Sequence, residues 1–157
     1  MTDPEHDLLA TLARDKTVLE VGSWHGGSLL ALATTARVAH SIDWHQGMDE
    51  NQPEPGCDTL PKMWANIRHL PNVVLHVGTT EQVAPCLRDG YFDLVFIDGT
   101  HSHDAVVRDV QLLRRKVIWG GMFAFHDYGL GLGVETAVQT LFGGPDLIQD
   151  SLAVCHV

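Results

Sequence analysis

The residues best placed to do chemistry follow two apolar runs in the second half of the chain. Asp98 directly follows the run 94–97, which is typical of a buried strand. A partly buried carboxylate at such a point is unfavourable without a partner, so function explains Asp98 better than folding does. A second apolar run, 117–125, also ends in polar residues: His126, Asp127 and Tyr128. Where parallel strands end at one edge of a sheet, such groups could bind a ligand or assist catalysis.

A glycine-rich turn near the start of the chain indicates a second part of the same site. The segment TVLEVGSWHGGS, residues 17–28, reads as a short buried strand, a glycine turn and the start of a helix. Glycines in such a turn let the backbone pass close to a ligand, and the helix N-terminus presents free N–H groups. The segment alone leaves open an ordinary strand-to-helix turn of another α/β protein.

Asp43 makes a nucleoside ligand the better interpretation of this turn. It ends the predicted strand 38–42 and lies 21 positions beyond Gly22, where an acid can accept hydrogen bonds from a ribose diol. A solvated loop carboxylate is the alternative for Asp43. The dinucleotide fingerprint G-x-G-x-x-G is not matched, because Trp24 occupies its third position and its indole would fill the space of a pyrophosphate.

These residues require a mostly parallel α/β sheet to position them. Runs of apolar residues predict strands at 17–21, 38–42, 73–77, 94–97, 117–125 and 152–157, with 146–149 pairing beside the last. Helical patterns fall at 4–15, 27–35 and 62–69, after Glu81 (disrupted by Pro85), after Ser102 as N-cap, and from 131. We expect the helix at 4–15 to cover one edge of the sheet and to contribute packing, not chemistry. The segment 44–61 has no periodicity and reads as a lid or substrate loop, with a disordered insertion as the alternative.

Length and composition limit the partners. A chain of 157 residues is expected to form a single domain, 1–157, with one site. Its formal charge of −10 repels nucleic acid and anionic membranes and favours a small-molecule ligand. Three cysteines without C-x-x-C spacing indicate neither a disulfide framework nor a structural zinc site, and no signal or membrane segment is visible, so we expect a cytoplasmic protein.

Two motifs carry a resemblance to a known family. The form E-x-G-x-x-x-G at 20–26 resembles motif I of the class I S-adenosylmethionine-dependent methyltransferases. The stretches FDLVFIDGTHSHDAV and GGMFAFHDY resemble a family of that fold that includes natural-product O-methyltransferases and relatives of cephalosporin hydroxylase. The resemblance implies a Rossmann-like α/β sheet, mostly parallel with the last strand antiparallel and with helices on both faces. It also implies that S-adenosylmethionine is bound by Glu20, Gly22, Ser23, Gly26, Asp43, Trp44, Thr79 and Asp98. Thr79 stands where the family often has an acid, so Thr79 and Thr80 must contact the adenine differently or not at all.

The same resemblance implies a metal and a base. Members of this group often bind a divalent ion through acids that end the fourth and fifth strands, positions held here by Asp98, His126 and Asp127. His126 replaces a carboxylate found in many members, which counts against magnesium and makes manganese or a similar ion more acceptable. His101 lies three residues past Asp98, where related enzymes place a lysine general base, and with an ordinary pKa of about 6.5 it could take a hydroxyl proton. The alternative is that His101 only starts a helix.

The sequence therefore predicts methyl transfer from S-adenosylmethionine to a hydroxyl of a small molecule, assisted by Mg or Mn, with Asp98 and His101 catalytic. An N-methyltransferase commonly has an N-P-P-Y-type segment where this chain reads DGTH. The sequence also leaves open a NAD-type oxidoreductase, which Trp24 disfavours, and a non-catalytic or complex-dependent cofactor-binding module. Because the chain shows no substrate-capping extension, either the 44–61 loop or a second subunit of a homo-oligomer is expected to close the site.

Overall fold

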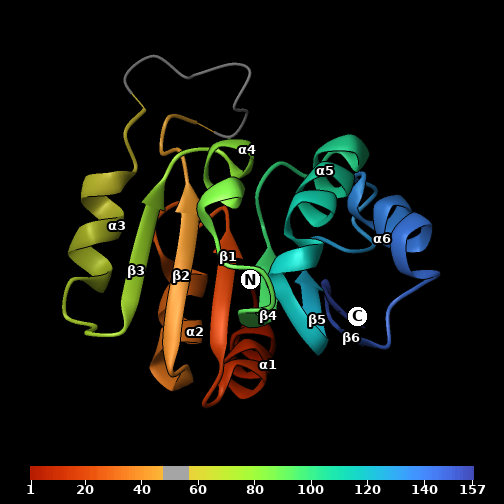
Figure 1. Ribbon diagram of the computed structural model, residues 1–157, viewed down its shortest axis with the longest axis horizontal. Coiled ribbons are helices and arrows are strands. Elements are labelled where there is room, and N and C mark those ends of the chain that lie inside the picture. Colours follow the sequence, from red (N-terminus) through yellow and green to blue (C-terminus); the bar gives the residue numbers. More distant parts are fainter. Residues whose placement is uncertain (48–56) are drawn as a thin grey trace.

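The computed structural model describes residues 1–47 and 57–157, which form a sheet of strand order β3-β2-β1-β4-β5-β7-β6 (Figure 1). The strands are β1 (Thr17–Val21), β2 (Val38–Asp43), β3 (Val73–Val77), β4 (Phe92–Ile97), β5 (Val117–Phe125), β6 (Leu147–Gln149) and β7 (Leu152–His156). The α-helices are α1 (Asp3–Ala13), α2 (Gly27–Thr35), α3 (Leu60–Ile67), α4 (Thr80–Val83), α5 (His103–Leu113) and α6 (Val134–Phe142). Two 3₁₀ turns, η1 (Ala84–Cys86) and η2 (Arg114–Lys116), complete the described elements.

The strand pairing confirms the predicted fold class. β1 pairs in parallel with both β2 and β4, and β4 pairs in parallel with β5. β7 is antiparallel to both of its neighbours, β5 and β6, so among the described strands it alone runs against the others. The chain builds outward from β1 to β2 and β3 and then returns to place β4 on the other side of β1. That reversal opens a crevice at the carboxyl ends of β1 and β4, where open α/β sheets bind their ligands.

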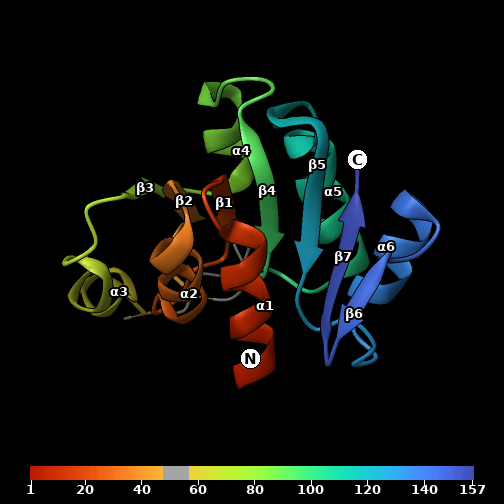
Figure 2. The same cartoon turned by 90° about the horizontal axis from the view of Figure 1, so that it is seen from below.

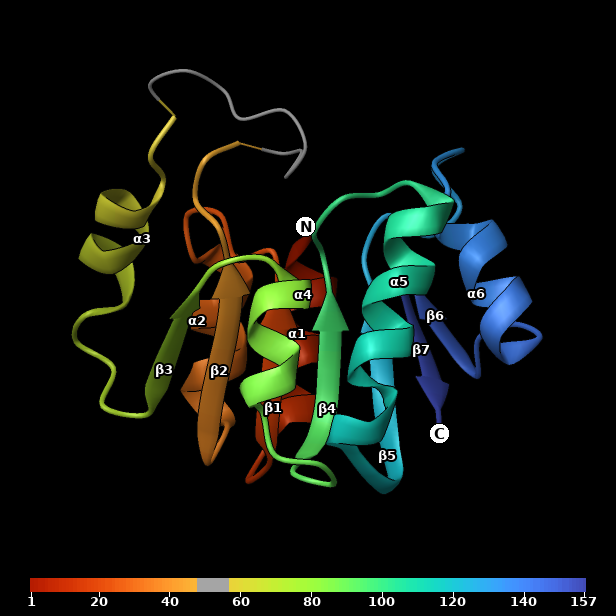
Figure 3. The ribbon, with the colours of Figure 1, turned by 45° about the horizontal axis from the view of Figure 1, so that its top comes forward.

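Both faces of the sheet are covered by helices, which creates two apolar layers. On one face α1, α2 and α3 bury Leu9, Leu29 and Met63 against strand residues such as Val18 and Phe96. On the other face residues of α5 and α6 pack against Val95, Phe123 and their neighbours. Figure 2 shows α1, α2 and α3 together on one side, and Figure 3 shows α4 and α5 in front of the sheet.

The predicted place of the first helix was wrong. α1 lies across a face of the sheet, because Leu9 and Ala13 are fully buried in the same cluster as Leu94 and Met122 of the central strands. A sheet that is apolar on both faces needs this cover, since its central strands would otherwise expose one side to water.

Most element bounds lie within two residues of the predictions. The predicted 27–35, 73–77 and 117–125 segments have the observed ends. α3 begins two residues earlier than predicted, at Leu60, with Pro61 in its first turn, where the missing N–H has no helical partner to lose. As predicted, Ser102 caps α5, accepting from the N–H of Ala105 at 3.4 Å, and Pro85 lies in the 3₁₀ turn that follows α4.

The predicted lid lies mostly outside the described residues, which omit 48–56, so it stays a prediction. The two described ends of the segment are tied together. His45 is 4% exposed, and its Nδ1 lies 2.7 Å from the Thr59 hydroxyl, while the Thr59 N–H donates to the His45 carbonyl at 3.2 Å. No helix in the described parts of the chain is long and apolar enough to cross a membrane.

A pair of stacked histidines on β2 and β3 predicts how stability responds to acid. His40 Nδ1 lies 2.9 Å from His76 Nε2. Burial lowers the pKa of both rings, that of His40 to about 4, with the facing ring adding to the effect at His40. A histidine whose pKa is lower in the folded state stabilises the fold above its unfolded pKa, and this contribution is lost as pH falls toward the folded value.

We therefore expect the free energy of unfolding to fall by about 2 kcal/mol between pH 6.5 and 4 because of this pair. His40→Leu should flatten that loss, as measured by urea unfolding across the interval. His69→Leu, which removes an exposed imidazole from the turn after α3, is the matched control and should keep the wild-type slope. Equal pH slopes in His40→Leu and wild type would contradict the prediction.

Candidate active site

A cavity of about 560 Å³ lies at the carboxyl ends of β1, β2 and β4. Six of the eight predicted cofactor residues line it: Gly22, Ser23, Asp43, Trp44, Thr79 and Asp98. Glu20 and Gly26 are not among the lining residues. The strand order brings the six together although they come from four separate segments of the chain. The structure therefore places most of the predicted cofactor residues around one space, as the crevice between β1 and β4 requires.

Asp43 ties the turn after β1 to the end of β2. One of its carboxylate oxygens accepts from the N–H of Trp24 and the other from the N–H of His45, each at 2.7 Å. The side chain is 10% exposed and borders the cavity. An ionised carboxylate has about four acceptor positions. Two backbone hydrogen bonds thus leave acceptor capacity for the hydroxyls of a ligand.

The glycine turn meets protein backbone as well as the cavity. Gly22 has φ +85°, and a Cβ there would collide with the backbone of Asp98 and Gly99. Gly26, the N-cap of α2, has φ +82°, and a Cβ there would lie 3.1 Å from side-chain atoms of Met63 and Ile67. The sequence suggested that the glycines admit a ligand. The structure shows that they also admit the end of β4 and one face of α3.

Glu20 lies beneath the turn. It is fully buried and accepts from the Ser28 hydroxyl, and burial raises its pKa well above the usual range for a carboxyl. Its second oxygen has no hydrogen-bond partner among the described residues, and neither does the buried hydroxyl of Ser23. Buried polar atoms without partners are uncommon and call for a ligand or an ordered water. Ser23 lines the cavity, so a bound cofactor could supply its missing partner.

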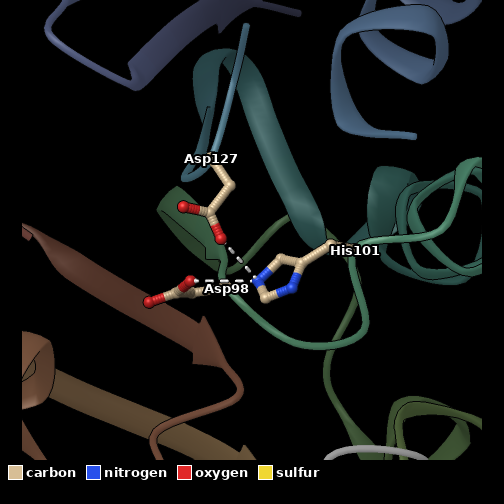
Figure 4. Close-up of side chains that lie close together, drawn as sticks. All are labelled: Asp98, His101 and Asp127. Atoms are coloured by element: carbon tan, nitrogen blue, oxygen red, sulfur yellow. Dashed lines mark ion pairs between the residues drawn. The ribbon is translucent and has the colours of Figure 1, made fainter. Parts of the chain in front are cut away.

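Asp98, His101 and Asp127 converge at the ends of β4 and β5 (Figure 4). Each offers one ligand atom, and these atoms all lie within 4.8 Å of one another. His101 Nε2 lies 3.0 Å from an Asp127 oxygen and 3.7 Å from an Asp98 oxygen. It is nonetheless a buried nitrogen without a properly aligned hydrogen bond among the described residues. Ligand atoms that lie this close together without an aligned hydrogen bond between them could bind a shared cation.

His126 is the fourth member of this group. Its Nδ1 lies 3.2 Å from an Asp98 oxygen and 3.1 Å from an Asp127 oxygen. All four residues predicted for metal binding and catalysis therefore lie together. His126 lines the cavity beside Asp98 and His101.

Asp98 and the imidazoles of His101 and His126 stabilise one another's charged forms. Burial alone would raise the pKa of Asp98, but His101 and His126 outweigh it, and the pKa lies below its usual value. Asp98 raises the pKa of His101, opposed by burial and assisted by Asp127. Burial lowers the pKa of His126, yet Asp98, Asp127 and Glu5 together leave it raised. In the metal-free protein the adjacent acids therefore favour the protonated imidazoles, and a divalent cation could take the place of these protons.

Three of the five described non-glycine residues with a positive φ lie near this site. Trp24, His45 and Asp127 have φ values of +42°, +60° and +59°. Residues other than glycine rarely adopt this left-handed conformation, which costs of order 1–3 kcal/mol and persists where the surrounding structure holds it. All three lie at the ends of β1, β2 and β5.

Sequence reasoning missed Glu5. This residue is 1% exposed, and its carboxylate lies 3.5 Å from Nε2 of His126. The sequence contains a T-x-x-E capping pattern at 2–5, and the structure forms that capping box. This pattern explains an acid at position 5 without any reference to residue 126. Nothing in the sequence indicated that the acid would also reach the site.

A family model described as a methyltransferase domain matches residues 19–128. A curated relative, uncharacterized protein R132 of Acanthamoeba polyphaga mimivirus, is 27% identical over 119 residues, 73% of this chain and 52% of that protein.

Two solved structures are similar to this chain in fold. Cofactor-bound Rv0187 from MTB is similar to this chain with a TM-score of 0.66 and 24% sequence identity, and the match covers 81% of this chain and 56% of the Rv0187 chain. The O-methyltransferase TomG from Streptomyces achromogenes, solved with S-adenosylmethionine, is similar with a TM-score of 0.66 and 22% sequence identity. The match covers 95% of this chain and 63% of the TomG chain. The chain thus spans only about half to two thirds of these proteins. Because the family model covers most of the chain, the chain belongs to the methyltransferase domain family, and its fold is the Rossmann-like fold of the S-adenosylmethionine-dependent methyltransferases.

Proposed function

We propose that this protein transfers a methyl group from S-adenosylmethionine to a hydroxyl of a small molecule with the help of a divalent cation. The observation that carries the proposal is the convergence of Asp98, His101 and Asp127 beside the cavity that Asp43 lines. The similarity to TomG, an O-methyltransferase, supports the same reaction class.

The cofactor would occupy the cavity with its ribose at Asp43. Gly22 and Ser23 of the turn would face its amino acid part, and Trp44 and Thr79 border the same space. Thr79 is the N-cap of α4 and forms a capping box with Gln82. Its N–H donates to Gln82 Oε1 and its carbonyl accepts from the N–H groups of Gln82 and Val83, each at 3.1 Å, so both its side chain and its backbone already serve the helix. Thr79 would therefore border the adenine by packing. Glu20 and Gly26 would act on the cofactor by holding the turn in place.

The residues present fit a divalent cation. Asp98 and Asp127 would hold it, with His126 as third ligand or as support for the acids. Two carboxylates suit magnesium or manganese, and imidazole nitrogen makes manganese the better choice. When bound, the ion would lower the pKa of an acceptor hydroxyl and help to hold its oxygen in place.

The chain's own groups would position the acceptor and take up its proton. Methyl transfer from a sulfonium is an in-line displacement, so orientation supplies much of the rate. We assign proton uptake to Nε2 of His101, since the adjacent carboxylates stabilise the imidazolium that results. Coordination of the cation by the same nitrogen is the competing role. A cofactor-binding module without catalysis would bind S-adenosylhomocysteine yet transfer no methyl group.

Asp43→Ala should weaken binding of S-adenosylhomocysteine by at least about 10-fold, since it removes a charged acceptor of ribose hydrogen bonds. Isothermal titration calorimetry measures the change. Asp104→Ala, which removes a 99% exposed carboxylate on α5, is the matched control and should bind as wild type does.

A second ligand separates loss of the ribose contact from loss of the turn that Asp43 also holds. An S-adenosylhomocysteine analogue without the 2′-hydroxyl should bind wild type more weakly than the parent does. It should bind Asp43→Ala about as well as the parent does. If the hydroxyl matters equally to both proteins, Asp43 does not bind the ribose and this part of the proposal is wrong.

A further inference from the structure

Glu5 is a buried acid that the proposed reaction does not use. Its side chain is 1% exposed and lies at the start of α1. In sequence it is more than 90 residues away from Asp98, His101, His126 and Asp127. The carboxylate accepts from the N–H and the hydroxyl of Ser151, at 2.9 and 2.7 Å, and from the N–H of Thr2 at 2.6 Å. These hydrogen bonds lower its pKa to about 2 against the opposing effect of burial. Glu5 is therefore a fixed negative charge inside the protein.

The charge faces one specific side of His126. Glu5 lies 3.5 Å from Nε2 of that ring, and the Ser151 hydroxyl lies 3.5 Å from the same nitrogen. The other nitrogen, Nδ1, faces the acids Asp98 and Asp127 at 3.2 and 3.1 Å. The two nitrogens of one imidazole thus point to different groups of partners. Only the Nδ1 side borders the place where the two acids meet.

An imidazole with a carboxylate at one nitrogen and a cation at the other is a recurring arrangement in metalloproteins. The carboxylate accepts the N–H, which sets the tautomer and the orientation of the ring and makes the free nitrogen a stronger ligand. A ring that carries its proton on Nε2 presents a lone pair on Nδ1. In this protein that lone pair would be directed toward Asp98 and Asp127.

We propose that Glu5, with Ser151, is a positioning residue that holds His126 with Nε2–H toward α1 and Nδ1 toward a divalent cation between Asp98 and Asp127. The inference rests on the metal site proposed above. It gives α1 a role in the site beyond packing, since the first turn of that helix supplies the acid and Ser151 connects it to the loop before β7. It also assigns His126 to the cation through Nδ1, which leaves His101 for the acceptor side.

The test is calorimetric titration of Mn²⁺ into the purified chain. Wild type should bind Mn²⁺, and Glu5→Gln should bind it about 10- to 100-fold more weakly, the usual effect of losing a residue that supports a metal ligand. Glutamine keeps the size of the side chain and an oxygen for the Thr2 N–H, so the capping box can persist. Thr2→Ala is the matched control, since it removes the other half of that capping box and leaves the Glu5 carboxylate in place. It should bind Mn²⁺ as wild type does.

A second variant and a second measurement keep the test decisive. Ser151→Ala removes the hydroxyl but not the backbone donor, and should weaken Mn²⁺ binding by less than Glu5→Gln does. ¹⁵N NMR of the protein loaded with Mg²⁺, which is diamagnetic, should show His126 protonated on Nε2 in wild type and a mixture of tautomers in Glu5→Gln. S-adenosylhomocysteine affinity should stay unchanged in both variants, which shows that they are folded.

The outcomes separate this inference from the proposed function. If wild type and Glu5→Gln bind Mn²⁺ equally and share one tautomer, the metal site stands and the role of Glu5 is overturned. If wild type binds no Mn²⁺ while S-adenosylhomocysteine binds, the cation part of the proposed function is wrong and this inference is wrong with it.

Discussion

Replacing His101 with alanine is expected to lower kcat by about 10²- to 10⁴-fold, the usual effect of losing a general base. Nε2 of His101 lies 3.0 and 3.7 Å from oxygens of Asp127 and Asp98, and the ring borders the cavity. Affinity for S-adenosylhomocysteine should hardly change, because the proposed base faces the acceptor rather than the cofactor. Single-turnover rates with any hydroxyl acceptor that the protein methylates, beside calorimetry with S-adenosylhomocysteine, measure the two effects.

The methyl-transfer rate should depend on pH with a defined sign. A base works in its unprotonated form, so the wild-type rate should fall as pH drops through the pKa of His101. Asp98 and Asp127 raise that pKa above its ordinary value in the metal-free protein, and a bound cation would lower it again. The acid limb of the rate profile should therefore move to lower pH as the Mn²⁺ concentration rises. It should be absent from His101→Ala.

Two controls separate a base from a ligand. Added imidazole should restore part of the rate of His101→Ala if the lost group was a base. If His101 binds the cation instead, the variant should lose Mn²⁺ affinity, and excess Mn²⁺ should restore the rate where imidazole does not. His103→Ala, two residues along at the start of α5, is the matched histidine control. Turnover of His101→Ala that matches wild type at every pH and Mn²⁺ concentration would leave His101 without a chemical role.

Removing divalent ions with EDTA should nearly abolish methyl transfer, and Mg²⁺ or Mn²⁺ should restore it. A cation that stabilises developing charge on the acceptor oxygen supplies several kcal/mol, which corresponds to about 10²- to 10⁴-fold in rate. Asp127→Asn should reproduce the effect, since it keeps the size of the side chain but removes one of the two acids that would hold the ion. Loss of Mn²⁺ binding in calorimetry should accompany the loss of rate.

Asp104→Asn provides the matched control for this substitution, because its carboxylate is 99% exposed and lies outside the cluster. It should bind Mn²⁺ and turn over as wild type does. Full activity of the EDTA-treated protein would show that the reaction needs no cation. Asp98 and Asp127 would then serve to orient the substrate and to hold His101 and His126.

The order of elements and most of their bounds were readable from the sequence. Strands buried on both faces carry continuous apolar runs, as in 94–97, and this local signal does not depend on the rest of the fold. Caps are equally local, which is why Ser102 could be assigned before the helix was seen. The acids Asp43 and Asp98 were found because strand ends in an open parallel sheet converge on one edge.

Contacts between distant segments required the tertiary structure. The sequence identified His101, His126 and Asp127 as candidates, yet the distances among their side chains depend on how β4 and β5 pair and on the left-handed backbone at Asp127. From the sequence, Gly22 was expected to make room for a ligand, while the backbone of Asp98 and Gly99, just after β4, is what a side chain there would meet.

Glu5 is the clearest case of a contact that the sequence could not indicate. Its local pattern is fully explained by a capping box, and its contact with His126 arises only because α1 packs across the sheet and Ser151 precedes β7. Local propensity and periodicity act over a few residues and are written in the sequence as patterns. The packing of one element on another depends on summed side-chain shapes across the whole chain, so only the folded molecule decides which distant side chains meet.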